Sequence, residues 1–275
     1  MPAPESISAL LADLDPVERT LLVPLVARAW GHRWHLDAAW TDTSAEQVLS
    51  HLDWGDVAWV PDPVTLGLVL WRTQRLCEWG QAHFAMHPTA LGLNVGAGLS
   101  DYFQWLNNGS NTWADVDRSC VMQIRSQCMP THARVHALSL DVCDEQWWAQ
   151  VQPCVASNHE PMWVMLEGLL VYLPPANARR VLRTVAEHAP AGSSLAFDVI
   201  PRWMEGWPIR VPVPASPAAK FQWGIGSVDE LEALHERLHL EQMESSPVPW
   251  SVWPWVNRTG WNACSPCALV RMSVS

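Results

Sequence analysis

The chain has 275 residues, of which 49% are hydrophobic, and this size and composition suit one α/β domain with additions. The formal net charge of −11 makes the phosphate backbone of a nucleic acid a poor partner, and no run of apolar residues is long enough for a membrane span. The seven cysteines show no disulfide-framework spacing and the first residues lack the basic group of a signal peptide, so we expect a cytoplasmic protein.

The N-terminal third shows helical periodicity. Between Val17 and Trp30 apolar residues recur at helical spacing after a proline suited to a first helical turn. Two further helical segments follow at Ser44–Leu52 and Pro63–Phe84. The sequence therefore predicts a helical cover over residues 1–88 before the first convincing strand.

From about Thr89 short apolar runs, each ending in a small or acidic residue, alternate with helical stretches, which is typical of parallel βαβ units. The pattern predicts strands at Ala90–Val95, Thr112–Val116, Arg134–Leu140, Met162–Leu166 and Ser194–Val199. It predicts helices at Leu99–Leu106, Asp144–Val151, Pro175–His188 and Ser227–Leu238. Residues 89–275 should thus form the core of a single structural domain.

The C-terminal part contains an insertion and two last strands. Residues 201–224 hold five prolines and three tryptophans without periodicity, as expected of a lid after the fifth strand. The runs Leu240–Val248 and Ala268–Val274 alternate like strands and could form an antiparallel pair that closes the sheet.

The chain has nineteen tryptophans, and each side chain suits either a packed core or a pocket for a flat ligand. Packing is the default for each of them. We nevertheless hypothesise that a subset lines a pocket for a flat or apolar acceptor: Trp203, Trp207, Trp223, Trp250, Trp253 and Trp255.

The strongest chemical signal is a predicted strand that runs directly into the glycine turn Gly96-Ala97-Gly98 before a helix. Ligands of α/β sheets bind at the carboxyl ends of strands, where glycine allows close approach of the backbone. Asp117 ends the next strand, where a carboxylate can accept both hydroxyl hydrogens of a ribose. Two further strand ends carry the carboxylates of Asp141 and Glu167, which could meet an adenine amine and the reacting centre.

A dinucleotide site is the alternative for such a turn. The dinucleotide fingerprint has a third Gly or Ala where this chain has Asp101, and a carboxylate there would repel a pyrophosphate. A methyl donor with a cationic sulfonium and an ammonium group fits the acid better. The sequence therefore favours S-adenosylmethionine over NAD.

Motifs over nearly the whole length resemble the leucine carboxyl methyltransferases and the related tetracenomycin-type polyketide O-methyltransferases. The similar segments are Glu18–Ala29, Trp71-Arg72-Thr73, Asn94–Leu99, Asp115-Val116-Asp117, Leu138–Val142 and Glu167–Leu173. This resemblance implies a class I methyltransferase: a Rossmann-like, seven-stranded α/β sheet with helices on both faces, an N-terminal helical cover and a Trp-rich lid.

The resemblance also implies roles for individual residues toward S-adenosylmethionine. Arg72 would hold the methionine carboxylate, and Glu167 would lie beside the ammonium group. Gly96, Ala97 and Gly98 would pass beneath the donor, and Asp117 would bind its ribose. Asp141 with Val142 would meet the adenine, and Arg28 would contact the donor or an acidic substrate.

The chain departs from the family pattern at three positions. Ser100 and Tyr102 stand in a segment where the family usually has Asp-Thr-Arg, so a basic residue is lost, and Cys77 replaces an aspartate. Asp101 could substitute for the shifted acid. These changes leave open a degenerate fold that acts as a binding or scaffold protein.

A carboxylate acceptor is already anionic at neutral pH and needs no general base, so catalysis would be positioning and desolvation. A phenol would need a base such as His32, His35 or His159. Arg28 and Tyr172 are further candidates for catalytic contacts, and a sulfur or nitrogen acceptor on the same fold stays open. We expect a small-molecule methyl acceptor and a monomer or homodimer.

Two metal-like motifs are set aside. His235-Glu-Arg-Leu-His239 has zinc-protease spacing, but no third ligand follows and the predicted end of a helix separates the two histidines. Cys264-Ser-Pro-Cys267 has the spacing of half a zinc site without a second half. We therefore expect no metal.

Overall fold

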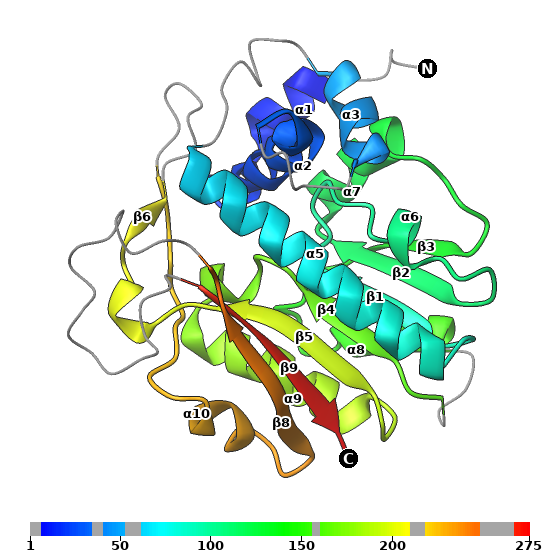
Figure 1. Cartoon of the computed structure of the whole chain (residues 1–275), viewed down its shortest axis with the longest axis vertical. Helices are drawn as coiled ribbons and strands as arrows, with labels where there is room; N and C mark the ends of the chain where they lie inside the picture. The colour runs from blue at the N-terminus through cyan, green and yellow to red at the C-terminus, as the bar shows by residue number, and fades with distance from the viewer. Residues whose placement is uncertain (1–6, 35–40, 53–61, 156–159, 210–217, 248–266) are drawn as a thin grey trace.

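A computed structural model describes residues 7–34, 41–52, 62–155, 160–209, 218–247 and 267–275. Its centre is a seven-stranded sheet in the order β3-β2-β1-β4-β5-β9-β8 (Figure 1). The strands are β1 Leu91–Val95, β2 Thr112–Asp117, β3 Val135–Ser139, β4 Trp163–Leu166, β5 Ser194–Val199, β8 Leu238–Ser245 and β9 Ala268–Val274. All seven predicted strands are therefore present, each displaced by no more than a few residues.

The sheet is parallel except at one edge. β1 pairs with β2 and β4, and these pair with β3 and β5, all in parallel. β9 runs antiparallel to both β5 and β8, which confirms the predicted closing pair. The strand order reverses between β1 and β4, and ligands of open α/β sheets bind at such a point.

Helices cover both faces of the sheet, as the sequence predicts for strands that are apolar throughout. Every residue of β1 and β4 is buried. The long helix α5 Pro63–Met86 crosses one face, and α8 Trp147–Val151 and α9 Pro175–His188 lie on the other (Figure 1). α5 begins where Asp62 accepts hydrogen bonds from the N–H groups of Val64 and Thr65, with Pro63 in the first turn.

The N-terminal helices form a second core with one helix of the sheet layer. They are α1 Ile7–Asp13, the 3-10 helix η1 Glu18–Leu21, α2 Leu22–Trp34 and α3 Thr43–Ser50. Their apolar side chains pack together and against α7 Ser119–Cys128. In Figure 1, α1, α2 and α3 lie together at the top of the view, next to α7.

The segment after β5 forms a small separate unit. It contains the 3-10 helix η4 Arg202–Met204 and a two-stranded sheet of β6 Pro208–Ile209 and β7 Ala219–Lys220. The N–H group of Gln222 donates to the carbonyl of Val171 at 2.8 Å, which joins this unit to the 3-10 helix η3 Leu170–Tyr172. No central strand occurs in the described part of this proline-rich segment.

Several helices differ from the prediction, and α1 Ile7–Asp13 is one that was not predicted. α6 Phe103–Leu106 is shorter than the predicted helix because the glycine turn continues through Ser100. α10 Asp229–Glu232 ends early since β8 begins at Leu238. α7 was not predicted because polar residues interrupt its apolar positions. Within the described ranges no helix is long and apolar enough to cross a bilayer.

Candidate active site

The glycine turn lies at the carboxyl end of β1. Gly96 and Gly98 have φ angles of 72° and 51°, a left-handed conformation that side chains other than glycine rarely adopt. The N–H groups of Gly96 and Ala97 donate to the carbonyl of Val116 at 2.8 and 3.0 Å. A methyl group on Gly96 would lie 3.1 Å from the side chain of Leu169, so the turn needs its glycines.

Asp117 ends β2 directly beside this turn. Its carboxylate accepts hydrogen bonds from the N–H groups of Gly98 and Arg118, each at 2.7 Å. Burial raises the pKa of Asp117 although both hydrogen bonds act against that rise. The structure therefore places Asp117, the residue predicted to bind the ribose, directly beside the glycine turn.

Asp141 and Val142 follow β3 at the same edge of the sheet. The N–H group of Leu140 donates to the carbonyl of Asp117 at 2.9 Å, which fixes the start of this segment. The Asp141 side chain is exposed and accepts from the N–H group of Cys143 at 2.8 Å. Val142 is buried in the main core. Of these two residues, therefore, only Asp141 has a side chain that a ligand could reach.

A buried charge cluster lies at the ends of β4 and β5. Arg72 of α5 donates through Nε to Oε1 of Glu167 at 2.9 Å and through Nη1 to Oδ2 of Asp198 at 3.1 Å. The Tyr102 hydroxyl donates to the other Glu167 oxygen at 2.7 Å, and the Gly168 N–H group donates to Asp198 at 2.6 Å. One guanidinium thus bridges two carboxylates from neighbouring strand ends.

The cluster fixes the charges of its members. Burial would raise the pKa of Glu167, but Arg72, Arg28 and the Tyr102 hydroxyl outweigh burial and leave that pKa below its ordinary value. The pKa of Asp198 is raised, since its burial outweighs the attraction of Arg72. The pKa of Arg72 is raised because the two carboxylates outweigh its own burial. Glu167 is therefore a stable anion and a weak base.

Two members of this cluster were not predicted as site residues. Asp198 is the next-to-last residue of β5, and Glu167 directly follows β4, so a search near the carboxyl ends of strands would have found both. The position of Asp198 inside an apolar run concealed the signal. The sequence singled out Tyr102 only because it departs from the family pattern. In the structure its hydroxyl donates a hydrogen bond to Glu167.

Arg28 is almost completely buried, with 2% of its surface exposed. Its Nε lies 2.9 Å from Oδ2 of Asp42, and its Nη2 donates to the carbonyl of Leu99 at 3.1 Å. Within the described part of the chain, its Nη1 has no hydrogen-bond partner. A buried, unpaired guanidinium N–H is costly, so this group is suited to an anionic ligand.

The remaining catalytic candidates divide into one that the structure describes and three that it does not. Burial raises the pKa of Tyr172 to about 12, although Thr20 near its hydroxyl acts against that rise. Tyr172 is therefore neutral at physiological pH and can donate a hydrogen bond. His35 and His159, with the side chain of His32, lie outside the described residues.

The tryptophans of the hypothetical acceptor pocket occupy different environments. Trp223 is 3% exposed and packs in the main core, whereas Trp207 is 40% exposed. Trp203 contacts Trp207 edge to face, with ring centres 5.2 Å apart. Trp250, Trp253 and Trp255 lie outside the described residues.

Of the two metal-like motifs, the structure describes the histidine pair in full and the cysteine pair in part. His235 lies between α10 and β8 while His239 lies within β8, so the two histidines do not share a helix face. Cys267 is buried beside β9, and Cys264 lies outside the described residues.

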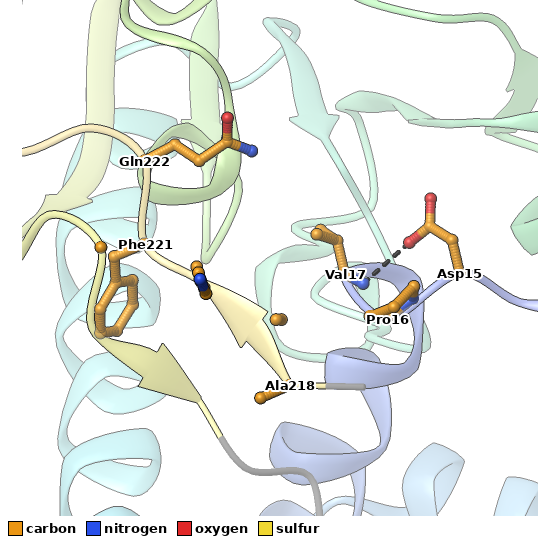
Figure 2. Close-up of a pocket in the computed structure, with 9 residues that line it drawn as sticks. Asp15, Pro16, Val17, Ala218, Phe221 and Gln222 are labelled. Carbon is orange, nitrogen blue, oxygen red and sulfur yellow. Dashed lines mark hydrogen bonds between the residues drawn. The ribbon is translucent and has the colours of Figure 1, made fainter. Parts of the chain in front are cut away.

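A cavity of about 520 Å³ opens between the N-terminal cover and the segment after β5 (Figure 2). Residues from both sides line it: Asp15, Pro16, Val17, Gly206, Ala218, Ala219, Lys220, Phe221 and Gln222. Figure 2 shows Phe221 and Gln222 on one side and Asp15 to Val17 on the other. None of these residues was predicted to contact an acceptor.

Comparisons with known proteins agree with this architecture. Residues 87–186, from just before β1 to near the end of α9, match the family model for leucine carboxyl methyltransferases. The chain is 29% identical over 233 residues to the tetracenomycin polyketide synthesis O-methyltransferase TcmP of Streptomyces glaucescens, and the match covers 84% of each chain.

A solved structure gives the same result for the fold. A putative methyltransferase from Thermobifida fusca superposes with a TM-score of 0.52 at 12% identity, over 84% of this chain and 87% of that one. The seven-stranded sheet, the glycine turn beside Asp117 and the two sequence matches confirm the resemblance seen in the sequence. The chain is therefore an S-adenosylmethionine-dependent methyltransferase that is similar to the leucine carboxyl methyltransferases over residues 87–186.

Proposed function

We propose that this methyltransferase esterifies a carboxylate of a small organic acid. The supporting observation is the charge state of two groups in the described charge cluster. Glu167 is held as an anion by Arg72, and Tyr172 is held neutral by its raised pKa. An acceptor that is already anionic needs no base, and a carboxylate meets this requirement.

The described residues fit the donor. The unpaired Nη1 of Arg28 suits a carboxylate such as that of the methionine part, whereas Arg72, predicted for that role, already pairs with Glu167 and Asp198. Glu167 suits the ammonium group, and Asp117 beside the Gly98 N–H suits the ribose hydroxyls. When bound, S-adenosylmethionine supplies a sulfonium methyl group that passes to an acceptor oxygen while the sulfur keeps the bonding electron pair.

The protein's own contribution is then positioning and electrostatics. Arg72 is held by two carboxylates, so its orientation is set before any ligand arrives. The Tyr102 hydroxyl fixes the second oxygen of Glu167 in the same way. Since the cluster is nearly buried, these charges act with little screening by water.

The relative TcmP is named as an O-methyltransferase of polyketide synthesis, which supports an oxygen acceptor on a small molecule. The test uses donor labelled on the methyl group and a panel of aromatic and aliphatic carboxylic acids. We expect a labelled product that loses its label in mild base, because esters hydrolyse under conditions in which methyl ethers are stable.

Matched variants complete this experiment. Glu167→Gln should abolish transfer because it removes a charge from the buried cluster, whereas Glu145→Gln at an exposed position should keep full activity. A base-stable label would instead indicate a phenol, nitrogen or sulfur acceptor. If the wild type neither transfers the methyl group nor binds the donor, the protein is a scaffold protein.

A further inference from the structure

Lys220 is the only lysine among the 17 basic residues of the chain, and it lines the cavity between the N-terminal cover and the segment after β5. It lies at the end of β7, where Ala219 is buried and Lys220 is exposed. Lys220 forms no ion pair with any residue that the structure describes. The cavity therefore carries a cation that is available to a ligand.

The rest of the cavity wall is suited to a flat apolar body. Pro16, Val17, Ala218 and Phe221 contribute apolar surface (Figure 2). The cavity is a groove open to solvent, with a volume of about 520 Å³. Gln222 provides a polar group at one side, as Figure 2 shows.

The wall of this cavity is joined to the candidate active site. The Phe221 ring stacks on Tyr172, with ring centres 5.9 Å apart and an angle of 21° between the planes. The Gln222 side chain donates through Nε2 to the carbonyl of Tyr172 at 2.7 Å. Tyr172 in turn lies close enough to Arg72 and Asp198 for their charges to act on its hydroxyl.

The charge of the one carboxylate in the cavity wall is partly offset. Asp15 lies 2.9 Å from Nη1 of Arg118, which it shares with Glu18, and its other oxygen accepts from the N–H groups of Val17 and Glu18 at 2.8 Å. Asp15 is therefore held by its own partners, and Lys220 is the cation among the residues that line the cavity.

We infer that this cavity is the acceptor site, and that it takes a planar aromatic acid whose second, unmethylated anionic group is bound by Lys220. The inference deepens the proposed function and rests on it. Phe221 would stack on the aromatic body, and the Tyr172 hydroxyl would lie between the acceptor and the charge cluster.

The first test measures acceptor binding without turnover, by calorimetry on the protein saturated with S-adenosylhomocysteine. The probes are 2,6-naphthalenedicarboxylate, which has an anionic group at each end, and 2-naphthoate, which has one. We expect the diacid to bind more tightly. Lys220→Met should lower the affinity for the diacid by roughly threefold, as expected for the loss of an exposed ion pair. The variant should then bind the diacid and the monoacid equally well.

Two further variants test the location of the site. Ala218→Trp would fill the cavity from an exposed position, so it should abolish binding of both probes without affecting the fold. Arg179→Met makes the same charge change as Lys220→Met on helix α9, outside the cavity, and should leave both affinities unchanged.

The single lysine allows an independent measurement. An amine-acylating reagent can modify only the Lys220 side chain and the N-terminal amine, which serves as an internal control. Saturating diacid should slow the acylation of Lys220, as measured by peptide mass spectrometry, and leave the N-terminal amine unaffected. Equal rates at Lys220 with and without diacid would contradict the inference.

The outcomes separate this inference from the proposed function. S-adenosylhomocysteine could bind while the probes bind to none of the proteins, or bind equally to wild type and Ala218→Trp. Either result would show that the cavity is not the acceptor site and would leave the methyltransferase function unaffected. If S-adenosylhomocysteine itself fails to bind the wild type, the proposed function is wrong as well.

Discussion

Four carboxylates stand at or just beyond the carboxyl ends of parallel strands: Asp117, Asp141, Glu167 and Asp198. The four carboxylates differ in their hydrogen-bond partners and in their exposure, and therefore in the ligand groups that they can bind. Asp117 accepts two backbone N–H groups, Asp141 is exposed, and Glu167 and Asp198 share one guanidinium. One rule about strand ends thus places four acids, while the neighbours of each acid decide what it can bind.

Sequence alone identified three of these four acids, because each follows an apolar run and precedes a helix or a turn. Asp198 was hidden between Phe197 and Val199, inside the strand itself. The pairing of Arg72 with two carboxylates could not be predicted either, since it joins α5 to residues 95 and 126 positions away in the chain.

The tryptophans of the segment after β5 provide a test at the level of single residues. Trp223→Leu should lower the free energy of unfolding by about 3 kcal/mol, since its side chain is buried in the main core. Trp207→Leu should change it by less than about 0.5 kcal/mol because that side chain is exposed.

Denaturant titration of both variants measures these differences, with acceptor KM as the second readout. A larger loss of stability in Trp207→Leu than in Trp223→Leu would contradict the assignment of Trp223 to the core. A changed KM in Trp207→Leu at unchanged stability would instead support the hypothesis that this tryptophan lines the acceptor pocket.

At the scale of elements, the strands were predicted better than the helices. A buried parallel strand is a short apolar run, and such runs stand out in β1, β4 and β5. The short helices α6 and α10 are limited by their neighbours in the chain, the glycine turn before α6 and the strand β8 after α10. Both helices were therefore predicted too long, and α1 and α7 were missed.

The 3-10 helix η1 is the element that covers the glycine turn. A methyl group on Gly98 would lie 3.6 Å from Cβ of Leu21, at the end of η1. Asp15 and Glu18 exchange hydrogen bonds between side chains and backbone N–H groups at 2.8 Å, which fixes the start of η1. Arg118 lies 2.9 Å from both carboxylates and ties this start to the end of β2.

This arrangement predicts the effect of Arg118→Ala. Since the side chain is 51% exposed, the loss of stability should be below about 1 kcal/mol, but the amides of η1 should exchange with solvent a few times faster. Hydrogen exchange followed by mass spectrometry would show the change in peptides that span residues 15–22, with the strands of the sheet unaffected.

Arg202→Ala is the matched control, because Arg202 is equally exposed and also pairs with an acid, Glu230. Its η1 peptides should exchange at the wild-type rate. Unchanged exchange of η1 in Arg118→Ala would show that Arg118 does not hold this element on the glycine turn.

At the scale of the whole molecule, the buried His83 couples the packing of α5 on the sheet to pH. Its Nδ1 lies 3.1 Å from the Ser194 hydroxyl at the start of β5. Burial and the neighbouring His87 lower the pKa of His83 from about 6.5 to about 4. Between these two values the unfolded chain binds a proton that the folded chain does not.

His83 therefore contributes stability that is fully present above pH 6.5 and is lost as the pH falls toward 4. Comparison with His83→Gln isolates this contribution: the advantage of the wild type in unfolding free energy should shrink by up to about 1.4 kcal/mol per pH unit over that window. A constant difference between the two proteins from pH 7 to 4.5 would contradict the lowered pKa.

The most direct test of the account is a calorimetric titration of wild type and Asp117→Ala with S-adenosylhomocysteine. Asp117 meets the glycine turn at 2.7 Å, and the account predicts saturable binding to wild type and none to the variant, with both proteins folded by circular dichroism. Equal affinity in the two proteins would contradict the assignment of this strand edge as the donor site.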